Sequence, residues 1–250
     1  MTMPSPAEET IPPELRVYML ELRVQASAAA YLFQDLEVKI TERKRLAEGI
    51  QRINRGGGPP PLEMERSSYE RDVKTMTNLV GPILGDVQGF FSALGVIASI
   101  LWPSQRSLRR ETSEVVDLRL GRGAKIRRIL GVHEDSILKT RTGGDEDVRG
   151  GLLHFDEMID EFAQAHGNDT TVPLEIGSSA LGTAVTRSTA VRWLDEDSLD
   201  LWVNGRKGNL RKLQEELQQT VGRIHLGFDR LGLLDKKGRG CLPFRYVVVC

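Results

Sequence analysis

The chain has 250 residues, and its charge is nearly balanced, with 34 Lys and Arg against 35 Asp and Glu. Hydrophobic residues make up 40% of the sequence and charged residues 28%. This composition is too apolar for a wholly disordered chain and too neutral for a histone-like polycation. The length suits one or two domains with a sizeable core.

Several classes of site are excluded by the residues that would build them. The two cysteines, Cys241 and Cys250, form no C-x-x-C pair, which excludes a zinc ribbon or a thioredoxin-type site. The four histidines lack H-E-x-x-H spacing, so we expect neither a metal nor a cofactor. The polar start of the chain is unlike a signal peptide. The apolar run Phe90–Trp102 is about 13 residues long, short of the roughly 20 that span a bilayer. We therefore expect a cytoplasmic protein without a membrane span.

The first half of the chain predicts long helices. Residues 1–13 are rich in Pro and Glu and are expected to be flexible, and a helix is predicted over 14–54, where Gly49 is the only Gly or Pro. This helix is long enough either to dimerise or to pack within the chain. Three glycines and three prolines at 56–61 predict a linker loop, because they cannot continue a helix.

A second helical region is predicted over 67–101. Gly81-Pro82 and Gly85 interrupt it, so it is expected to be kinked or divided into two shorter helices. Its apolar run, Phe90–Trp102, is expected to be a buried core helix that Pro103 ends. Residues 104–122 have mixed charge and receive no assignment. A short helix is predicted over 124–130, with Gly131 at its end.

The second half of the chain predicts two further helices and a small β-hairpin. Asp145 is a suitable N-cap for a helix with an apolar stripe, and residues 170–189 are expected to form a loop. Residues 189–194 and 199–203 predict the hairpin, which Asn204-Gly205 ends. Leu210–Leu231 predicts the last helix, with Leu213, Leu217, Val221 and Ile224 on one face, and the tail 232–250 receives no assignment. The predicted fold is mainly α, an antiparallel helical bundle with a small C-terminal β-hairpin in one domain over 14–231.

Arg149 and His154 are the candidate catalytic residues. A histidine titrates near neutral pH and can give or take a proton at a ribose hydroxyl, and an arginine can hold a phosphate through two hydrogen bonds. Together they would suffice for metal-independent cleavage of RNA by its own 2′-hydroxyl. Five residues on a straight helix place the two side chains about 140° apart. Convergence therefore requires a loosened turn at Gly150-Gly151 or two helices meeting across a dimer axis. The alternative is that both are solvated residues beside an apolar stripe.

Three segments resemble an uncharacterised bacterial group related to HEPN domains. Val148–Asp160 (VRGGLLHFDEMID) resembles the signature of that group, in which Leu-Arg-Asn is followed by a Glu-His-Phe-Asp-Glu run, a hydrophobic pair and Asp. Phe90–Pro103 resembles its small-residue helix ending in Leu-Trp-Pro. Ala124–Ser136 resembles its segment with Leu-Gly-Val followed by acidic residues. The resemblance extends loosely over 14–231.

The resemblance implies a helical bundle and, from the wider superfamily, an Arg-x4–6-His motif that cleaves RNA at a dimer interface without metal. Arg149 would stabilise the phosphate and His154 would act as acid or base. The implied partners are RNA, a second copy of the chain and, as in toxin–antitoxin systems, a cognate antitoxin. Gly150 and Leu153 depart from the pattern, which usually has a polar residue after the Arg and often a Glu before the His. The alternative hypothesis is a catalytically silent HEPN-like module that binds a partner protein or a nucleotide.

The remaining polar clusters have two interpretations each. The stretch 104–130 is locally basic and predicts either an RNA-facing patch or a solvated face diluted by acidic residues. Its cations are Arg106, Arg109, Arg110, Arg119, Arg122, Lys125, Arg127 and Arg128. The carboxylates near Asp156 have no neighbouring His or Cys cluster, so no metal site is expected there. His133 is expected at the surface, and Trp102 and Trp193 are expected in the core.

Overall fold

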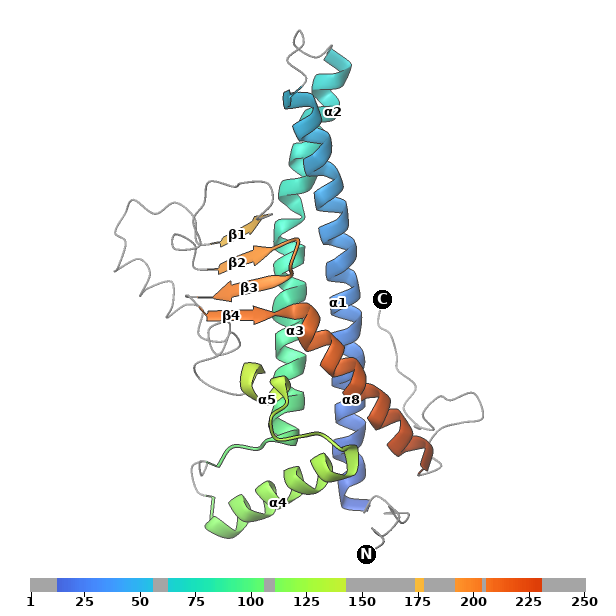
Figure 1. Ribbon diagram of the computed structural model, residues 1–250, viewed down its shortest axis with the longest axis vertical. Coiled ribbons are helices and arrows are strands. Elements are labelled where there is room, and N and C mark those ends of the chain that lie inside the picture. Colours follow the sequence, from blue (N-terminus) through green and yellow to red (C-terminus); the bar gives the residue numbers. More distant parts are fainter. Residues whose placement is uncertain are drawn as a thin grey trace, which may run out of the picture.

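The computed structural model describes residues 13–55, 63–105, 111–142, 174–177, 192–203 and 206–230. Its described helices are α1 (Pro13–Arg55), α2 (Glu63–Asn78), α3 (Val80–Leu101), α4 (Ser113–Leu130), α5 (Ile137–Thr142) and α8 (Leu210–Arg230). Its described strands are β1 (Leu174–Gly177), β2 (Arg192–Asp195), β3 (Asp200–Val203) and β4 (Arg206–Asn209). The protein is mainly helical with a small sheet near the C-terminal end, which confirms the predicted fold class (Figure 1).

A long antiparallel pair of helices, α1 and α3, forms the body of the molecule (Figure 1). Apolar residues recur every three or four positions on the inner face of α1. They are buried along most of the helix, as expected for an amphipathic helix. The inner face comprises Leu15, Met19, Leu22, Ala26, Ala29, Phe33, Leu36 and Ile40. Gly89 of α3 lets the two helices approach closely, because a Cβ there would lie 3.0 Å from the Leu32 side chain.

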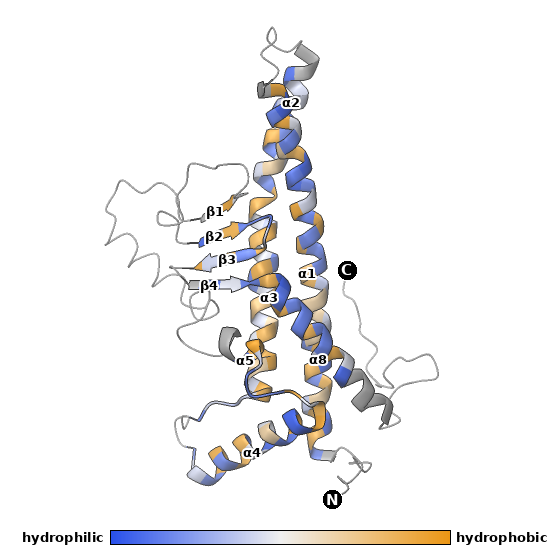
Figure 2. Ribbon diagram, in the orientation of Figure 1, coloured by the Kyte–Doolittle hydropathy of each residue, from blue (hydrophilic) through white to orange (hydrophobic). Residues whose placement is uncertain are grey.

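The predicted helices of the first half are confirmed. The region 67–101 divides into α2 and α3, with Leu79 between them, and Pro82 lies in the first turn of α3, where the missing N–H costs little. The stretch Arg66–Leu101 has the length and apolar composition of a membrane span, but 67% of its apolar window is buried inside the protein. Figure 2 shows α3 as a predominantly hydrophobic helix beside the more polar α1. This stretch therefore has the burial of a core helix.

Helix α4 is longer than the sequence predicted. It begins at Ser113 rather than at residue 124, so part of the unassigned stretch 104–122 is helical. Val115, Val116 and Leu118 lie among charged residues in its first two turns, a run too short and too mixed to establish a helical period. Its end at Gly131 is as predicted: Gly131 has φ 59°, and the N–H groups of Gly131 and Val132 bond to carbonyls of the last turn.

The sheet has four described strands in the order β1-β2-β3-β4, where the sequence predicted only a hairpin. The hairpin β2–β3 is confirmed, with Trp193 opposite Trp202. Asn204-Gly205 does not end the sheet, because β4 continues antiparallel to β3, and β1 lies within the predicted loop 170–189 and pairs in parallel with β2. Both missed strands have four residues. β4 (RKGN) has no apolar alternation and β1 (LEIG) is too short for its alternation to be distinctive, so their pairing partners define them.

Helix α8 follows β4 directly and crosses the N-terminal half of α1 (Figure 1), with Arg211 in its first turn paired with Glu37 of α1. Leu213 and Leu217 are buried and Val221 is half-buried, as the predicted face requires. Trp193 is buried as expected, whereas Trp102 is only half-buried at the end of α3. The predicted helix that begins near Asp145, the linker 56–61 and the tail 232–250 lie outside the described residues.

Candidate functional site

The candidate catalytic pair, Arg149 and His154, lies outside the described residues. Its predicted convergence therefore stays a prediction. No group of three His, Cys, Asp or Glu side chains that could hold a metal ion occurs in the described part of the chain. The described residues offer three other polar or concave regions, which differ in how fully their polar groups are already used.

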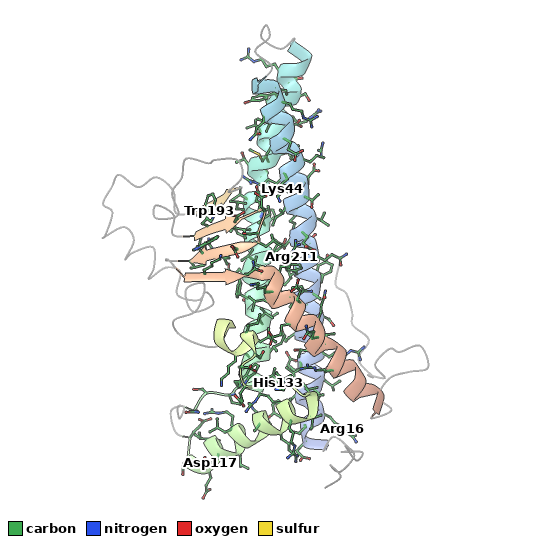
Figure 3. The ribbon with its side chains drawn as sticks, in the orientation of Figure 1. Arg16, Lys44, Asp117, His133, Trp193 and Arg211 are labelled. Carbon is green, nitrogen blue, oxygen red and sulfur yellow. The ribbon has the colours of Figure 1, made fainter. Side chains whose placement is uncertain are left out.

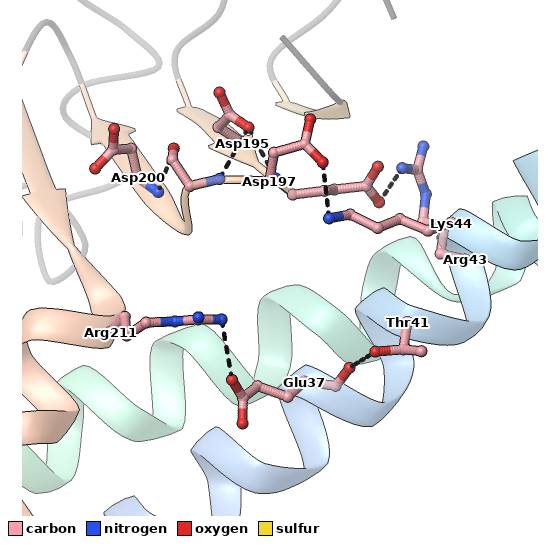
Figure 4. A network of polar contacts seen from close by, with 10 residues as sticks. Glu37, Thr41, Arg43, Lys44, Asp195, Asp197, Asp200 and Arg211 are labelled. Atoms are coloured by element: carbon pink, nitrogen blue, oxygen red, sulfur yellow. Dashed lines mark hydrogen bonds and ion pairs between the residues drawn. The ribbon is translucent and has the colours of Figure 1, made fainter. Parts of the chain in front are cut away.

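The first region joins the sheet to α1 through ion pairs (Figure 4). Arg43 forms an ion pair with Glu196, whose side chain is only 2% exposed. The Nη2 atom of Arg43 also donates to the Ile176 carbonyl oxygen at 3.0 Å. Lys44 Nζ lies 2.8 Å from Asp197 Oδ1 in the turn between β2 and β3. These contacts fill the space between α1 and the turn with mutually satisfied charges. The region holds the sheet in place, and its charges are paired with one another.

A related contact joins α1 to α3. Lys39 Nζ lies 2.6 Å from both Asp35 Oδ2 and Asp86 Oδ2, and Asp86 is buried. Burial lowers the pKa of Lys39, but its hydrogen bonds to Asp35 and Asp86 outweigh that effect and raise the pKa overall. The lysine is therefore a stable cation that neutralises a buried carboxylate, and it is poorly suited to act as a base.

The second region is a small polar cavity of about 210 Å³ between the α4–α5 connection and α8. Ser136 donates to the Glu216 carboxylate, which also accepts the Ile137 N–H at 3.3 Å. The Ser136 hydroxyl oxygen accepts the Leu138 N–H at 3.2 Å. The Ser136 hydroxyl and the Glu216 carboxylate therefore cap the short helix α5 and attach it to α8. His133 is exposed at the edge of this cavity, as the sequence predicted (Figure 3).

The third region is an open groove of about 1000 Å³ between the start of α1 and α4, named here the α1–α4 groove. From α1 it is lined by Glu14, Leu15 and Tyr18, and from 111–125 by Glu111, Glu114, Val115, Asp117, Leu118, Arg119, Gly121, Arg122 and Lys125. Leu15 forms a buried base, whereas Val115 is 45% and Leu118 is 75% exposed. The groove thus presents large apolar side chains to solvent at one end of the molecule.

The position of α4 explains why these apolar side chains are exposed. Its C-terminal half packs on the body through Ile126 and Leu130, and through Gly123, where a Cβ would lie 2.5 Å from Pro103 Cδ. Its N-terminal half extends beyond α3, as the labelled Asp117 shows (Figure 3). Val115 and Leu118 are three residues apart in that extending half, so they share a face, and both remain exposed there.

The cations of the groove are bound within the chain. Arg119 Nη1 donates to both Glu111 oxygens at 2.9 and 3.0 Å, and Lys125 Nζ lies 3.7 Å from Glu14. The Arg122 guanidinium lies 4.1 Å from the centre of the Tyr18 ring and donates to the Tyr18 hydroxyl at 2.9 Å. These partners favour a structural role for these three cations over the RNA-facing patch.

The carboxylates of the groove are less occupied. Glu114 and Asp117 are exposed and form no ion pair with any described residue. Four carboxylates line the groove against three cations, so the unpaired charge beside Val115 and Leu118 is negative. The arrangement can bind an apolar surface whose edge carries positive charge.

The sequence did not reveal this groove. Val115 and Leu118 are separated by Val116 and Asp117 and lie in a stretch that received no assignment. The only local signal was their spacing of three, which is too short a pattern to distinguish a helix face from chance. No family model, curated protein or solved structure matches the chain.

Proposed function

We propose that this chain is a helical interaction module that binds a partner protein in the α1–α4 groove. The ligand is a helical segment of the partner with an apolar stripe and flanking Lys or Arg residues. The observation that carries the proposal is the 75% exposure of Leu118 beside the unpaired carboxylate of Asp117. This is the protein-binding alternative to the catalytic hypothesis.

The energetics of the groove support a partner of this chemistry. Covering a fully exposed leucine or valine side chain contributes about 1.5–3 kcal/mol, so Leu118 and Val115 offer two anchors of useful size. Positive charge on the partner would be attracted by Glu114 and Asp117. Such attraction mainly increases the association rate and the selectivity for basic over acidic partners.

A synthetic peptide tests the proposal directly. The probe is a fluorescent helical peptide with a leucine stripe between lysines, titrated with the full chain while its anisotropy is followed. We expect Leu118→Ser to weaken binding by about tenfold, since tenfold corresponds to about 1.4 kcal/mol and the substitution removes most of one anchor. Asp117→Lys should also weaken binding of the same peptide, and the loss of affinity should be larger at low salt than at high salt.

Val96→Ser is the matched control, because Val96 is a 37% exposed residue of α3 outside the groove. Its affinity for the peptide should equal that of the unchanged protein. Equal losses from Leu118→Ser and Val96→Ser would contradict the proposal. So would an equally tight complex with a peptide in which glutamates replace the lysines.

A second candidate function is metal-independent RNA cleavage by Arg149 and His154. It is favoured by the Val148–Asp160 segment and by the chemistry of an arginine and a histidine acting on a phosphodiester with its own 2′-hydroxyl. In this role Arg149 stabilises the charge on the phosphate and His154 transfers the proton.

Growth after induced expression distinguishes the two functions. RNA cleavage predicts toxicity and fragmented total RNA for the unchanged chain, and both effects should disappear in Arg149→Ala/His154→Ala. Purified protein should retain the activity in a chelator. Leu118→Ser should leave this activity intact. Intact RNA from all variants would leave partner binding as the function.

A further inference from the structure

A second apolar stripe lies on the outer face of α1, opposite the face that packs on α3. It consists of Val17, Val24, Tyr31 and Val38, spaced seven residues apart. Val17 is 70%, Tyr31 68% and Val38 62% exposed, and Val24 is half-buried. The inner face of α1 is already covered, so this stripe is additional to the core. Exposed valine and tyrosine in such regular order need a physical explanation.

The spacing places these residues on one nearly straight line. Seven residues complete two helical turns less about 20°, so successive members of the stripe are rotated only slightly around the helix. At the α-helical rise per residue, the stripe is about 31 Å long. In heptad terms the four residues occupy position a. Position d then holds Leu20, Ser27, Gln34 and Thr41. The α1 stripe is therefore apolar at a and mostly polar at d.

We infer that the α1 stripe binds a second copy of this chain as a parallel, in-register helix pair. β-Branched residues at position a favour two parallel strands, and three of the four a residues are valine. A parallel pair places each a residue against its own copy. Because the interface is the same on both protomers, it closes as a two-fold dimer.

The charges beside the stripe favour the parallel orientation. Arg16 occupies heptad position g, and Glu21 occupies position e of the following heptad. In a parallel pair these two positions face each other across the interface, so the dimer contains this Arg–Glu contact twice. Arg16 is exposed near the start of α1 (Figure 3). Within the described residues Arg16 has no ion pair, and the Glu21 carboxylate accepts a single hydrogen bond, from Gln25 Nε2 at 2.7 Å. An antiparallel pair centred on Ser27 and Ala28 would instead bring like flanks together, with Glu21 near Asp35.

The size of the stripe sets the expected strength. A contact about 31 Å long and about 10 Å wide covers on the order of 300 Å² per protomer, less than the roughly 800 Å² of a standard interface. The polar d residues weaken the contact further. We therefore expect a dimer that dissociates on dilution rather than a permanent one.

Sedimentation velocity of the full chain over a concentration series tests the inference. The unchanged protein should shift from monomer to dimer as its concentration rises. Val38→Lys should raise the dissociation constant at least tenfold, because it places two like charges against each other on the stripe. Val96→Lys, the same change at an exposed valine of α3, should leave the dimer unchanged. Circular dichroism of each variant checks that the fold is retained.

A charge exchange tests the orientation. Arg16→Glu and Glu21→Arg should each weaken the dimer, and the double variant should restore it. A mixture of the two single variants should form a mixed dimer. A monomer at every concentration would overturn the inference. A dimer that withstands Val38→Lys would place the interface elsewhere and would overturn it equally.

Discussion

Arg43 and Glu196 illustrate how single residues hold this fold together. Both side chains are largely buried between α1 and the β2–β3 turn, where an unpaired charge is costly. Lys44 and Asp197 form a neighbouring pair across the same junction, but both side chains are partly exposed. The two pairs join the same elements but differ in burial, and Arg43 also donates to the Ile176 carbonyl oxygen.

Glu196→Ala should destabilise the protein by about 3 kcal/mol, because it leaves the Arg43 charge buried without its carboxylate. Lys44→Ala should cost less than about 1 kcal/mol, as for other exposed pairs. Urea unfolding followed by circular dichroism measures both. Equal losses from the two variants would show that burial of the Arg43 pair has no special importance.

Gly123 and Gly121 provide a second comparison, both within α4. A Cβ at Gly123 would lie 2.5 Å from Pro103 Cδ and 2.9 Å from the Leu101 carbonyl oxygen, whereas a Cβ at Gly121 meets nothing within 4 Å. Gly123→Ala should therefore destabilise by about 1–3 kcal/mol through overpacking. Gly121→Ala should stabilise by up to about 1 kcal/mol through helix propensity. Thermal melts of both variants check the opposite signs.

At the scale of elements, β4 shows what holds a strand that sequence reasoning missed. Its side chains Lys207 and Asn209 both contact Asp200 on β3, with Lys207 Nζ 2.7 Å from Oδ2 and Asn209 Nδ2 2.7 Å from Oδ1. Partial burial raises the pKa of Asp200, but hydrogen bonds from Lys207, Asn209 and Ser198 outweigh it and hold the pKa below its ordinary value of 3.8. The β3–β4 pairing is thus linked to an ionised carboxylate.

This link predicts a pH dependence. Because the pKa of Asp200 is lower in the folded than in the unfolded chain, its contribution to stability is present above the unfolded pKa and is lost as the pH falls through the folded pKa. We expect the free energy of unfolding of Asp200→Asn and of Lys207→Met to fall less steeply than that of the unchanged protein between neutral pH and the acid range below that pKa. Urea midpoints measured across that range test this. A decline as steep as in the unchanged protein would contradict it.

Elements with a strong apolar period were predicted well, and those without one were not. Helix α1, the division of 67–101 and the β2–β3 hairpin follow from spacing, prolines and glycines that act locally. In the first half of α4, in β1 and in β4, no apolar period is sustained long enough to predict the element. They are stabilised by neighbours distant in sequence, such as β2 for β1 and β3 for β4. No local rule identifies those neighbours.

At the scale of the molecule, burial is concentrated in the α1–α3 pair and declines toward α2. Thirteen residues of α3 are buried, whereas none of the residues 66–78 of α2 is. Hydrogen exchange should therefore be slowest in Phe90–Ala98 and much faster in Tyr69–Thr77, since poorly packed helices open locally at low cost. Peptide-resolved exchange by mass spectrometry measures this. Equal protection of the two segments would mean that α2 opens only with the whole fold.

The sequence by itself determined the helical class, the long helices, the hairpin and the last helix, because apolar spacing and helix-ending residues act within a few turns. It also supplied Arg149 and His154 as a catalytic hypothesis. Only the tertiary structure decided which apolar residues are covered. Leu15 and Val17 are both apolar residues near the start of α1, yet one lies against the body and the other faces solvent. The α1–α4 groove and the α1 stripe arise from that distinction, because periodicity defines the faces of a helix and packing decides which of them remain open.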